Sequence, residues 1–193
     1  MPANNKSQLL KKLLLIGVGV LLLIGVVFAV LAFMPKGIAL EKYEGEGYSL
    51  LVPKEYERDE SGSTTTFDEK TDDSDTKSTI LVLNESFGSK LTESQKDEVL
   101  GYFDNSAESI LKNSITTSDS NLKNLKNEKI THDGSPARRI TAEVENDGKI
   151  TGNLTMLITI TDNSTYIVGV LVHSGDKALG SSVDKIIGSF NIE

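Results

Sequence analysis

The chain has 193 residues, a length that allows one ordinary domain and an appended segment. It contains no cysteine, which excludes disulfides, thiolate catalysis, cysteine-type zinc sites and an acylated-cysteine lipoprotein anchor. Acidic residues outnumber basic ones by 28 to 20, giving a net charge of −8. Because such a surface repels phosphate backbones, we expect no nucleic acid among the partners.

Residues 13–34 form one apolar run without a charged side chain. As a helix rising 1.5 Å per residue this run spans about 33 Å, enough to cross a hydrocarbon core of about 30 Å. Lysines 6, 11 and 12 precede the run, whereas no acidic residue occurs before Glu41. The positive-inside rule therefore places residues 1–12 in the cytoplasm and the rest of the chain outside it. We expect a single-pass cell-membrane protein anchored through residues 13–34.

A cleaved signal peptide is the alternative interpretation of this run, and the run also contains a candidate helix-pairing motif. A cleaved signal peptide has a shorter apolar region of about 7–15 residues, and the best cleavage candidate, residues 30–32, lies inside the run. We expect the anchor to be retained. Gly25 and Ala29 have the spacing that can bring two membrane helices together, although chance produces it readily in a helix rich in Gly and Ala.

Residues 35–47 are predicted to be a juxtamembrane connector, because Pro35 ends the membrane helix and three glycines offer little to pack. Without the three N-terminal lysines, 17 basic residues face 28 acidic ones, so the exported part has a net charge of about −11. Such a surface fits a cation, a cationic partner or no charged partner, and it also serves solubility.

The globular domain is predicted to cover residues 48–193. Its first strand is expected over 48–52, ending at Pro53. Residues 63–68 are β-prone and polar, which suits an edge strand, and 70–77 form a charged loop. Residues 78–85 carry apolar side chains on both faces, as a central strand does.

A helix is predicted to begin at Thr92, which forms a capping box with Gln95. Apolar residues then recur at helical spacing and give the helix one apolar stripe. They are Val99, Tyr102, Phe103, Ala107, Ile110 and Leu111. A loop rich in Ser, Thr and Asn follows over 113–121.

The next part of the chain indicates an antiparallel meander, because strand patterns alternate with short turn sequences. Asp133-Gly134, 146–148 and 162–164 are the predicted turns. The predicted strands are 125–131, 137–145, 154–161 and 166–173, and the last, apolar on both faces, should be central.

A closing helix is predicted to begin between Asp176 and Ser181. Its apolar face consists of Leu179, Val183, Ile186, Ile187 and Phe190. Strands, a helix, a meander and a closing helix together predict an α+β domain with an antiparallel sheet. Since two strands are apolar on both faces, we expect helices or loops to cover both sides of the sheet.

Three segments give the exported region a resemblance to the PsbP/Mog1-like superfamily. They are 48–56 (YSLLVPKEY), 134–139 (GSPARR) and 183–190 (VDKIIGSF), in the order that the family has. The resemblance implies an α/β/α sandwich and a binding or accessory role without catalysis. Family members include an extrinsic subunit of the photosynthetic oxygen-evolving complex, photosystem assembly factors and a regulator of a small GTPase. An anchor stands where plant members have a cleaved transit peptide, so the photosynthetic role is not carried over.

Residues that could carry chemistry are few. The two histidines are His132, expected to be exposed before a turn, and His173, expected at a strand end. A structural or solvated role is the main interpretation of each, and a ligand or proton-transfer role is the alternative. No nucleophile elbow, phosphate-binding loop or paired metal-binding histidines occur.

An acidic group over 68–75 is the one metal candidate. It consists of Asp68, Glu69, Asp72, Asp73 and Asp75. Its oxygens suit a hard cation, but the calcium-loop pattern fails because the required Gly and closing Glu are missing. We interpret the group as a solvated loop and keep Asp72, Asp73 and Asp75 as weak metal candidates.

The sequence therefore favours a non-catalytic binding or assembly-accessory module outside the cytoplasm. We expect no enzymatic activity and no cofactor, and we expect another membrane or envelope protein as partner. Two alternatives stay open, namely a weak cation- or solute-binding domain and an enzyme whose site is assembled from residues distant in sequence.

Overall fold

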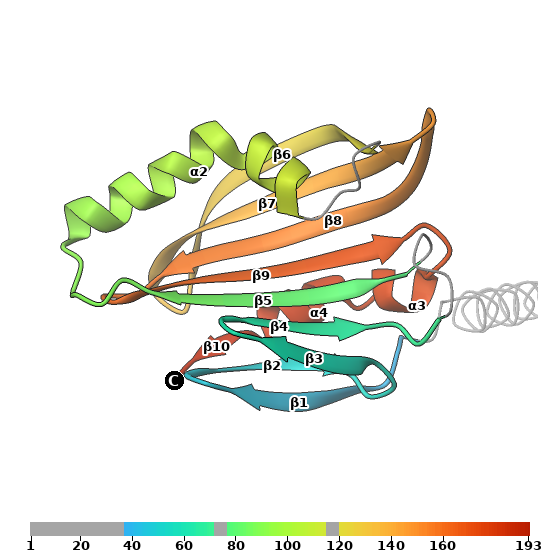
Figure 1. Ribbon diagram of the computed structural model, residues 1–193, viewed down its shortest axis with the longest axis horizontal. Helices are drawn as coiled ribbons and strands as arrows, with labels where there is room; N and C mark the ends of the chain where they lie inside the picture. The colour runs from blue at the N-terminus through green and yellow to red at the C-terminus, as the bar shows by residue number, and fades with distance from the viewer. Residues whose placement is uncertain (1–36, 72–76, 115–119) are drawn as a thin grey trace, which may run out of the picture. The chain divides into compact units, whose positions relative to one another are not determined.

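The computed structural model describes residues 37–71, 77–114 and 120–193 (Figure 1). Within these ranges no helix has both the length and the hydropathy that crossing a bilayer requires. The expected cytoplasmic segment 1–12, the expected anchor 13–34 and the metal candidates Asp72, Asp73 and Asp75 lie outside the described residues. So do the side chains of Ile110 and Leu111, which were assigned to the helix stripe.

A seven-stranded antiparallel sheet forms the centre of the domain, with strand order β3-β4-β5-β9-β8-β7-β6 (Figure 1). The strands are β3 (Glu57–Ser61), β4 (Thr64–Asp68), β5 (Thr79–Ser86), β6 (Ser120–His132), β7 (Ser135–Asn146), β8 (Lys149–Ile160) and β9 (Ser164–His173). β5 and β9 are central, as their two-sided apolar pattern predicted.

The predicted meander is confirmed, because β6, β7, β8 and β9 are each hydrogen-bonded to the next. Asp133 and Gly134, in the turn between β6 and β7, both have positive φ angles, of 46° and 79°. Asp147 and Gly148 repeat the arrangement between β7 and β8, with 49° and 74°. Both positions of a type I′ turn need positive φ, which explains why Asp-Gly occurs at both hairpins.

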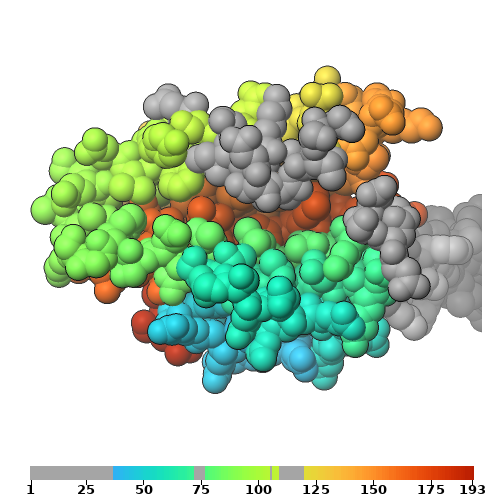
Figure 2. Space-filling view, viewed as in Figure 1, coloured from blue at the N-terminus to red at the C-terminus, as the bar shows by residue number. Residues whose placement is uncertain are grey.

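Helix α2 (Glu93–Ser114) covers the β6–β8 part of one face of the sheet (Figure 1). Its predicted capping box is present, because Thr92 N donates to Gln95 Oε1 at 2.9 Å and Gln95 N donates to Thr92 Oγ1 at 3.4 Å. Leu100, Phe103 and Ala107 pack against the sheet. In Figure 2, orange-red atoms of β9 are visible between α2 and β5, so α2 leaves part of this face uncovered.

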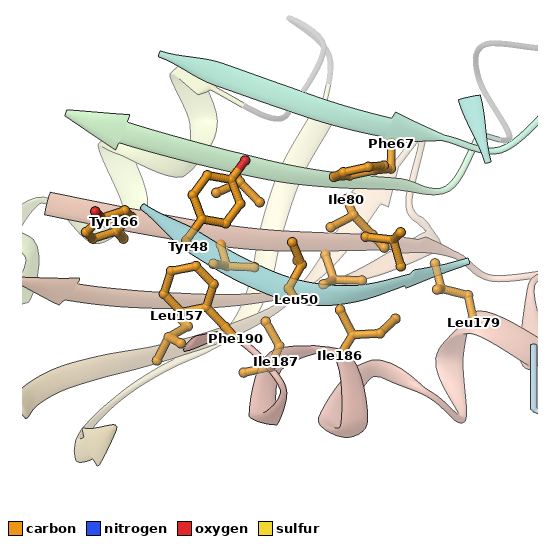
Figure 3. Packing of buried hydrophobic residues seen from close by; sticks show 14 of the residues in the cluster. Tyr48, Leu50, Phe67, Ile80, Leu157, Tyr166, Leu179, Ile186, Ile187 and Phe190 are labelled. Carbon is orange, nitrogen blue, oxygen red and sulfur yellow. The ribbon is translucent and has the colours of Figure 1, made fainter. Parts of the chain in front are cut away.

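The opposite face of the sheet is covered by a second, three-stranded sheet and two short helices (Figure 1). The sheet has the order β1 (Leu40–Gly45), β2 (Tyr48–Pro53) and β10 (Asn191–Ile192), and the helices are α3 (Lys177–Gly180) and α4 (Val183–Gly188). Figure 3 shows Leu50 of β2 packed between the strands and the side chains of Ile186 and Ile187. Leu179 and Phe190 complete this layer and are fully buried.

Four expectations about the fold need correction. The expected connector 35–47 contains β1, which pairs with β2 along its whole length. Strand 63–68 is not at the edge, because the exposed strand β3 pairs with it on the outer side. The single closing helix is divided at residues 181–182 into α3 and α4 and is followed by β10. The expected α/β/α sandwich would have helices on both faces of the sheet. In the structure a helix alone covers only one face, and a small sheet shares the other face with α3 and α4.

Candidate binding cleft

A cleft lies at the end of the domain where the β1–β2 turn and the β3–β4 turn meet the end of β5 and the start of β9. Its volume is about 520 Å³, within the range of small-molecule sites. We call it the tyrosine cleft, and it is lined by Tyr43, Glu46, Gly47, Tyr48, Glu60, Gly62, Ser63, Thr65, Asn84, Ser86, Ser164 and Tyr166. The chain enters the domain at Gly37, near the opposite end of β1.

Three tyrosine rings from three strands form the aromatic wall of the tyrosine cleft. The ring centroid of Tyr48 lies 6.0 Å from that of Tyr43 and 6.3 Å from that of Tyr166. Phe190 supports Tyr48 from below, with centroids 5.9 Å apart (Figure 3). These distances are typical of aromatic pairs; Tyr48 and Tyr166 meet edge to face, and the other two pairs are tilted.

The hydroxyl groups of these tyrosines already donate hydrogen bonds within the domain. Tyr43 Oη donates to Glu60 Oε1 at 2.7 Å, and Tyr48 Oη donates to Thr65 Oγ1 at 3.1 Å. Tyr166 Oη donates to the Gly47 carbonyl at 3.4 Å. Because a hydroxyl has one proton and two lone pairs, these oxygens are left as acceptors for any further group.

Burial raises the pKa of two of these hydroxyls. Burial, together with the hydrogen bond to Glu60, raises the pKa of Tyr43 to about 12. Burial also raises the pKa of Tyr166, and the nearby Glu46 carboxylate acts in the same direction. Both hydroxyls are protonated at neutral pH, as an unperturbed tyrosine also is, and they take part in hydrogen bonding.

Two carboxylates give the tyrosine cleft a negative wall. Glu60 accepts the hydrogen bond from Tyr43. Arg58 Nε lies 3.6 Å from Glu60 Oε1, and both side chains are about half exposed. Glu46 has no ion-pair partner within the described ranges, and its backbone carbonyl accepts from Asn84 Nδ2 at 3.3 Å. Asn84 Oδ1 is buried without a hydrogen bond to the described residues. The carboxylates of Glu46 and Glu60 and the amide oxygen of Asn84 thus supply acceptors to this wall.

Gly47 explains how the turn can approach Tyr166. Its φ angle is +76°, which glycine adopts without strain. A Cβ atom at this position would lie 3.2 Å from Tyr166 Oη. A glycine is therefore needed both for the backbone conformation and for space next to the ring.

The two histidines lie outside this cleft. His132 was expected to be exposed, but its side chain is only 12% exposed because its ring stacks on Phe190, with centroids 5.9 Å apart. His132 Nε2 also lies 2.8 Å from the Phe190 carbonyl, which indicates the expected structural role. His173 lies at the end of β9 as predicted, and its Nδ1 accepts from Gly175 N at 3.2 Å.

The described members of the acidic group have structural partners. Asp68 accepts from Thr79 Oγ1 at 2.6 Å and pairs with Lys77 at 3.1 Å. Glu69 Oε2 accepts from Ser78 N at 3.3 Å. Glu69 also shares a pocket of about 460 Å³ with His173 and Asp176. Even so, the described residues contain no group of three or more His, Asp or Glu side chains arranged to hold a metal ion.

Sequence reasoning missed the tyrosine cleft. Its residues come from six strands and two turns, and Tyr43 and Tyr166 are far apart in the chain. The one local signal was Tyr43 and Tyr48 on either side of the Glu46-Gly47 turn, which places two rings on one hairpin. That signal was hidden because residues 35–47 were assigned to a connector.

Two solved structures share the fold. One is the solution structure of the cyanobacterial PsbP protein CyanoP from Synechocystis sp. PCC 6803, with 15% sequence identity and a TM-score of 0.55. That match covers 80% of this chain and 93% of CyanoP. The other is LpqN of Mycobacterium tuberculosis, a protein involved in cell envelope biogenesis, with 14% identity and a TM-score of 0.52 over 80% of this chain and 90% of LpqN.

These likenesses show that the domain has a PsbP-like fold, which confirms the main structural expectation from the resemblance. At such low identity they show the fold alone. No family model matches the sequence, and no curated protein matches it either.

Proposed function

We propose that this chain is a non-catalytic accessory module, anchored in the membrane through residues 13–34, that binds an envelope protein at the tyrosine cleft outside the cytoplasm. The observation that carries the proposal is the tyrosine cleft itself, a space of about 520 Å³ lined by aromatic and carboxylate side chains. Tyr43 and Glu60 have the geometry of a nucleophile and its base, with 2.7 Å between the oxygens. The pKa of Tyr43 is raised to about 12, so its hydroxyl stays protonated and hydrogen-bonded to Glu60, a state that suits a binding surface.

The structural neighbours support an accessory role. LpqN takes part in cell envelope biogenesis, and a PsbP-like fold occurs in both neighbours without being tied to one chemistry. An extracytoplasmic module held at the membrane would encounter envelope proteins in particular. The cleft lies at the other end of β1 from Gly37.

The sheet edges support the cleft as the contact surface. β3 is exposed along its whole length and carries the sequence ERDES. β6, at the other edge, has Lys123, Lys126 and Lys129. Charged edge strands resist pairing with a strand from another chain. A partner is therefore expected to bind through side chains in the cleft instead of by strand addition.

Photo-crosslinking in intact membranes tests this proposal. Ser86 lines the cleft and is exposed, so a benzoylphenylalanine side chain at this position would reach a bound partner. Lys149 is exposed at the start of β8, away from the cleft, and is the matched control position. We expect a discrete protein adduct from Ser86 and none from Lys149. Equal labelling at the two positions, or none at either, would refute binding at the cleft.

A further inference from the structure

We propose that the tyrosine cleft binds the cationic side chain of an arginine or lysine presented by the partner protein. This inference rests on the proposed function and names the chemistry of the ligand. The first argument is the balance of hydrogen-bonding groups. Each tyrosine proton is already donated within the domain, and Glu46 and Glu60 can only accept when ionised. A ligand that complements these carboxylate and phenol oxygens supplies donors, and ammonium and guanidinium groups supply donors only.

The second argument is charge and aromatic surface together. Glu46 has no ion-pair partner among the described residues, so its charge is available to a ligand. Tyr43 is partly exposed in the same space, whereas Tyr48 and Tyr166 are buried, so the Tyr43 ring is the aromatic face that a cation can reach. The domain already contains one such contact, with the Arg58 guanidinium carbon 5.5 Å from the Tyr43 ring centroid.

The third argument is size. A cleft of about 520 Å³ is far larger than a bare metal ion needs, and the described residues form no metal-binding group. It suits an extended side chain whose apolar stem lies against aromatic rings while its charged end reaches a carboxylate. The net negative charge of the exported part would also attract a basic partner surface.

Nuclear magnetic resonance with labelled tyrosine rings tests the inference on the full-length protein in detergent micelles. The chain has five tyrosines, of which Tyr43, Tyr48 and Tyr166 line the cleft. Tyr56, whose hydroxyl donates to Asp176, and Tyr102, exposed on α2, lie elsewhere and serve as internal controls. The probes are acetyl-Gly-Arg-Gly-amide, acetyl-Gly-Lys-Gly-amide and the neutral analogue with citrulline in the central position.

We expect the cationic peptides to shift the ring signals of Tyr43 and Tyr166 saturably, with a Kd on the order of 1 mM for a single side chain. The signals of Tyr56 and Tyr102 should stay in place, and the citrulline peptide should cause no saturable shift. Glu46→Gln should weaken binding at least about threefold, as the loss of a partly exposed ion pair does. Glu41→Gln, an equal change of charge at an exposed site on β1, should leave the Kd unchanged.

Three results would overturn the inference: equal binding of the citrulline peptide, equal effects of Glu46→Gln and Glu41→Gln, or shifts at all five tyrosines. Spermidine binding at the same rings more tightly than the arginine peptide would assign the cleft to a free polyamine and overturn the protein source. If Ser86 crosslinks to a partner but no cationic peptide binds, the proposed function stands and only this inference fails. If the crosslink is absent as well, both fail.

Discussion

Arg138 of β7 holds Asp104 of α2 through two hydrogen bonds, with Nε 2.6 Å from Oδ1 and Nη2 3.1 Å from Oδ2. The guanidinium side chain is 9% exposed and the carboxylate 28%, so this bidentate pair lies at the border of the core. It joins α2 to the sheet, and these hydrogen bonds lower the pKa of Asp104 from its ordinary value.

Asp104→Asn should therefore destabilise the domain by about 2 kcal/mol, because Arg138 would lose its charged partner. Adding Arg138→Met should recover most of this loss, since replacing both members of a pair with apolar or neutral groups is often close to neutral. Urea denaturation measures both effects. Asp97→Asn, on an exposed part of α2, is the matched control and should cost little. A double variant less stable than the single one would contradict this role of the pair.

Ile187→Asp should unfold the domain. Ile187 is 4% exposed and packs in the core beneath β2, where an unpaired carboxylate costs several kcal/mol, a large part of the stability of a domain this size. Lys185→Asp, exposed on the same short helix, should stay within about 0.5 kcal/mol of the unmodified protein. Thermal unfolding followed by circular dichroism measures both. Equal melting temperatures would show that α4 does not pack on β2 as described.

Acid stability should depend on Asp162. Hydrogen bonds from Lys90 and Lys96 lower the pKa of this carboxyl to about 2, from an ordinary value of 3.8. A group whose pKa is lower in the folded state contributes stability above its unfolded pKa and loses it as the pH falls toward the folded one. The domain should therefore lose stability between pH 3.8 and about 2. Asp162→Asn should flatten this part of the stability curve, as should Lys96→Met. Denaturation at stepped pH measures the slope, and an unchanged slope in both variants would refute the assignment.

The proposed membrane anchor predicts on which side of the membrane the C-terminus lies. A reporter fused after Glu193 should be active outside the cytoplasm and should sediment with membranes, because residues 13–34 are apolar and follow three lysines. Cell fractionation with a reporter assay measures both properties. Release of the domain into the medium would instead identify residues 13–34 as part of a cleaved signal peptide.

The acidic loop should bind Ca²⁺ no more tightly than about 10⁻⁴–10⁻³ M, since the sequence lacks the Gly and Glu that preorganise a tight site. Micromolar Ca²⁺ should leave the melting temperature of the full-length protein unchanged. Replacing Asp72, Asp73 and Asp75 with Asn should not lower stability. A micromolar stabilisation that disappears in the triple variant would make cation binding the leading function.

Elements with strong local patterns were predictable from the sequence. The meander followed from alternating apolar residues and two Asp-Gly turns, and α2 began at its capping box. β3 was missed because its five residues are all polar and exposed, so burial leaves no pattern in the sequence. The split between α3 and α4 was also missed, because the apolar residues on either side keep helical spacing across Ser181 and Ser182.

The candidate site was harder to predict, for a physical reason. A cleft formed by loops and strand ends depends on tertiary packing, and each of its residues has an unremarkable local sequence. Tyr43 and Tyr166 meet only after β1–β2 packs on the large sheet. The histidines and the acidic group attracted attention as residue types, yet their described members serve structural contacts.

The pairing of β2 with β10 also has a kinetic consequence. Tyr48 is opposite Ile192 in the small sheet, so the contact joins segments near the two ends of the domain. Contacts between residues this distant in sequence slow folding, because a long loop must close before they form. Phe190, close to β10 in the chain, packs against Tyr48 and belongs to the same buried core as Leu50. A nascent chain would therefore complete this core only after residues 190–192 have been synthesised, and if the domain is exported as proposed, the core would be completed after transport.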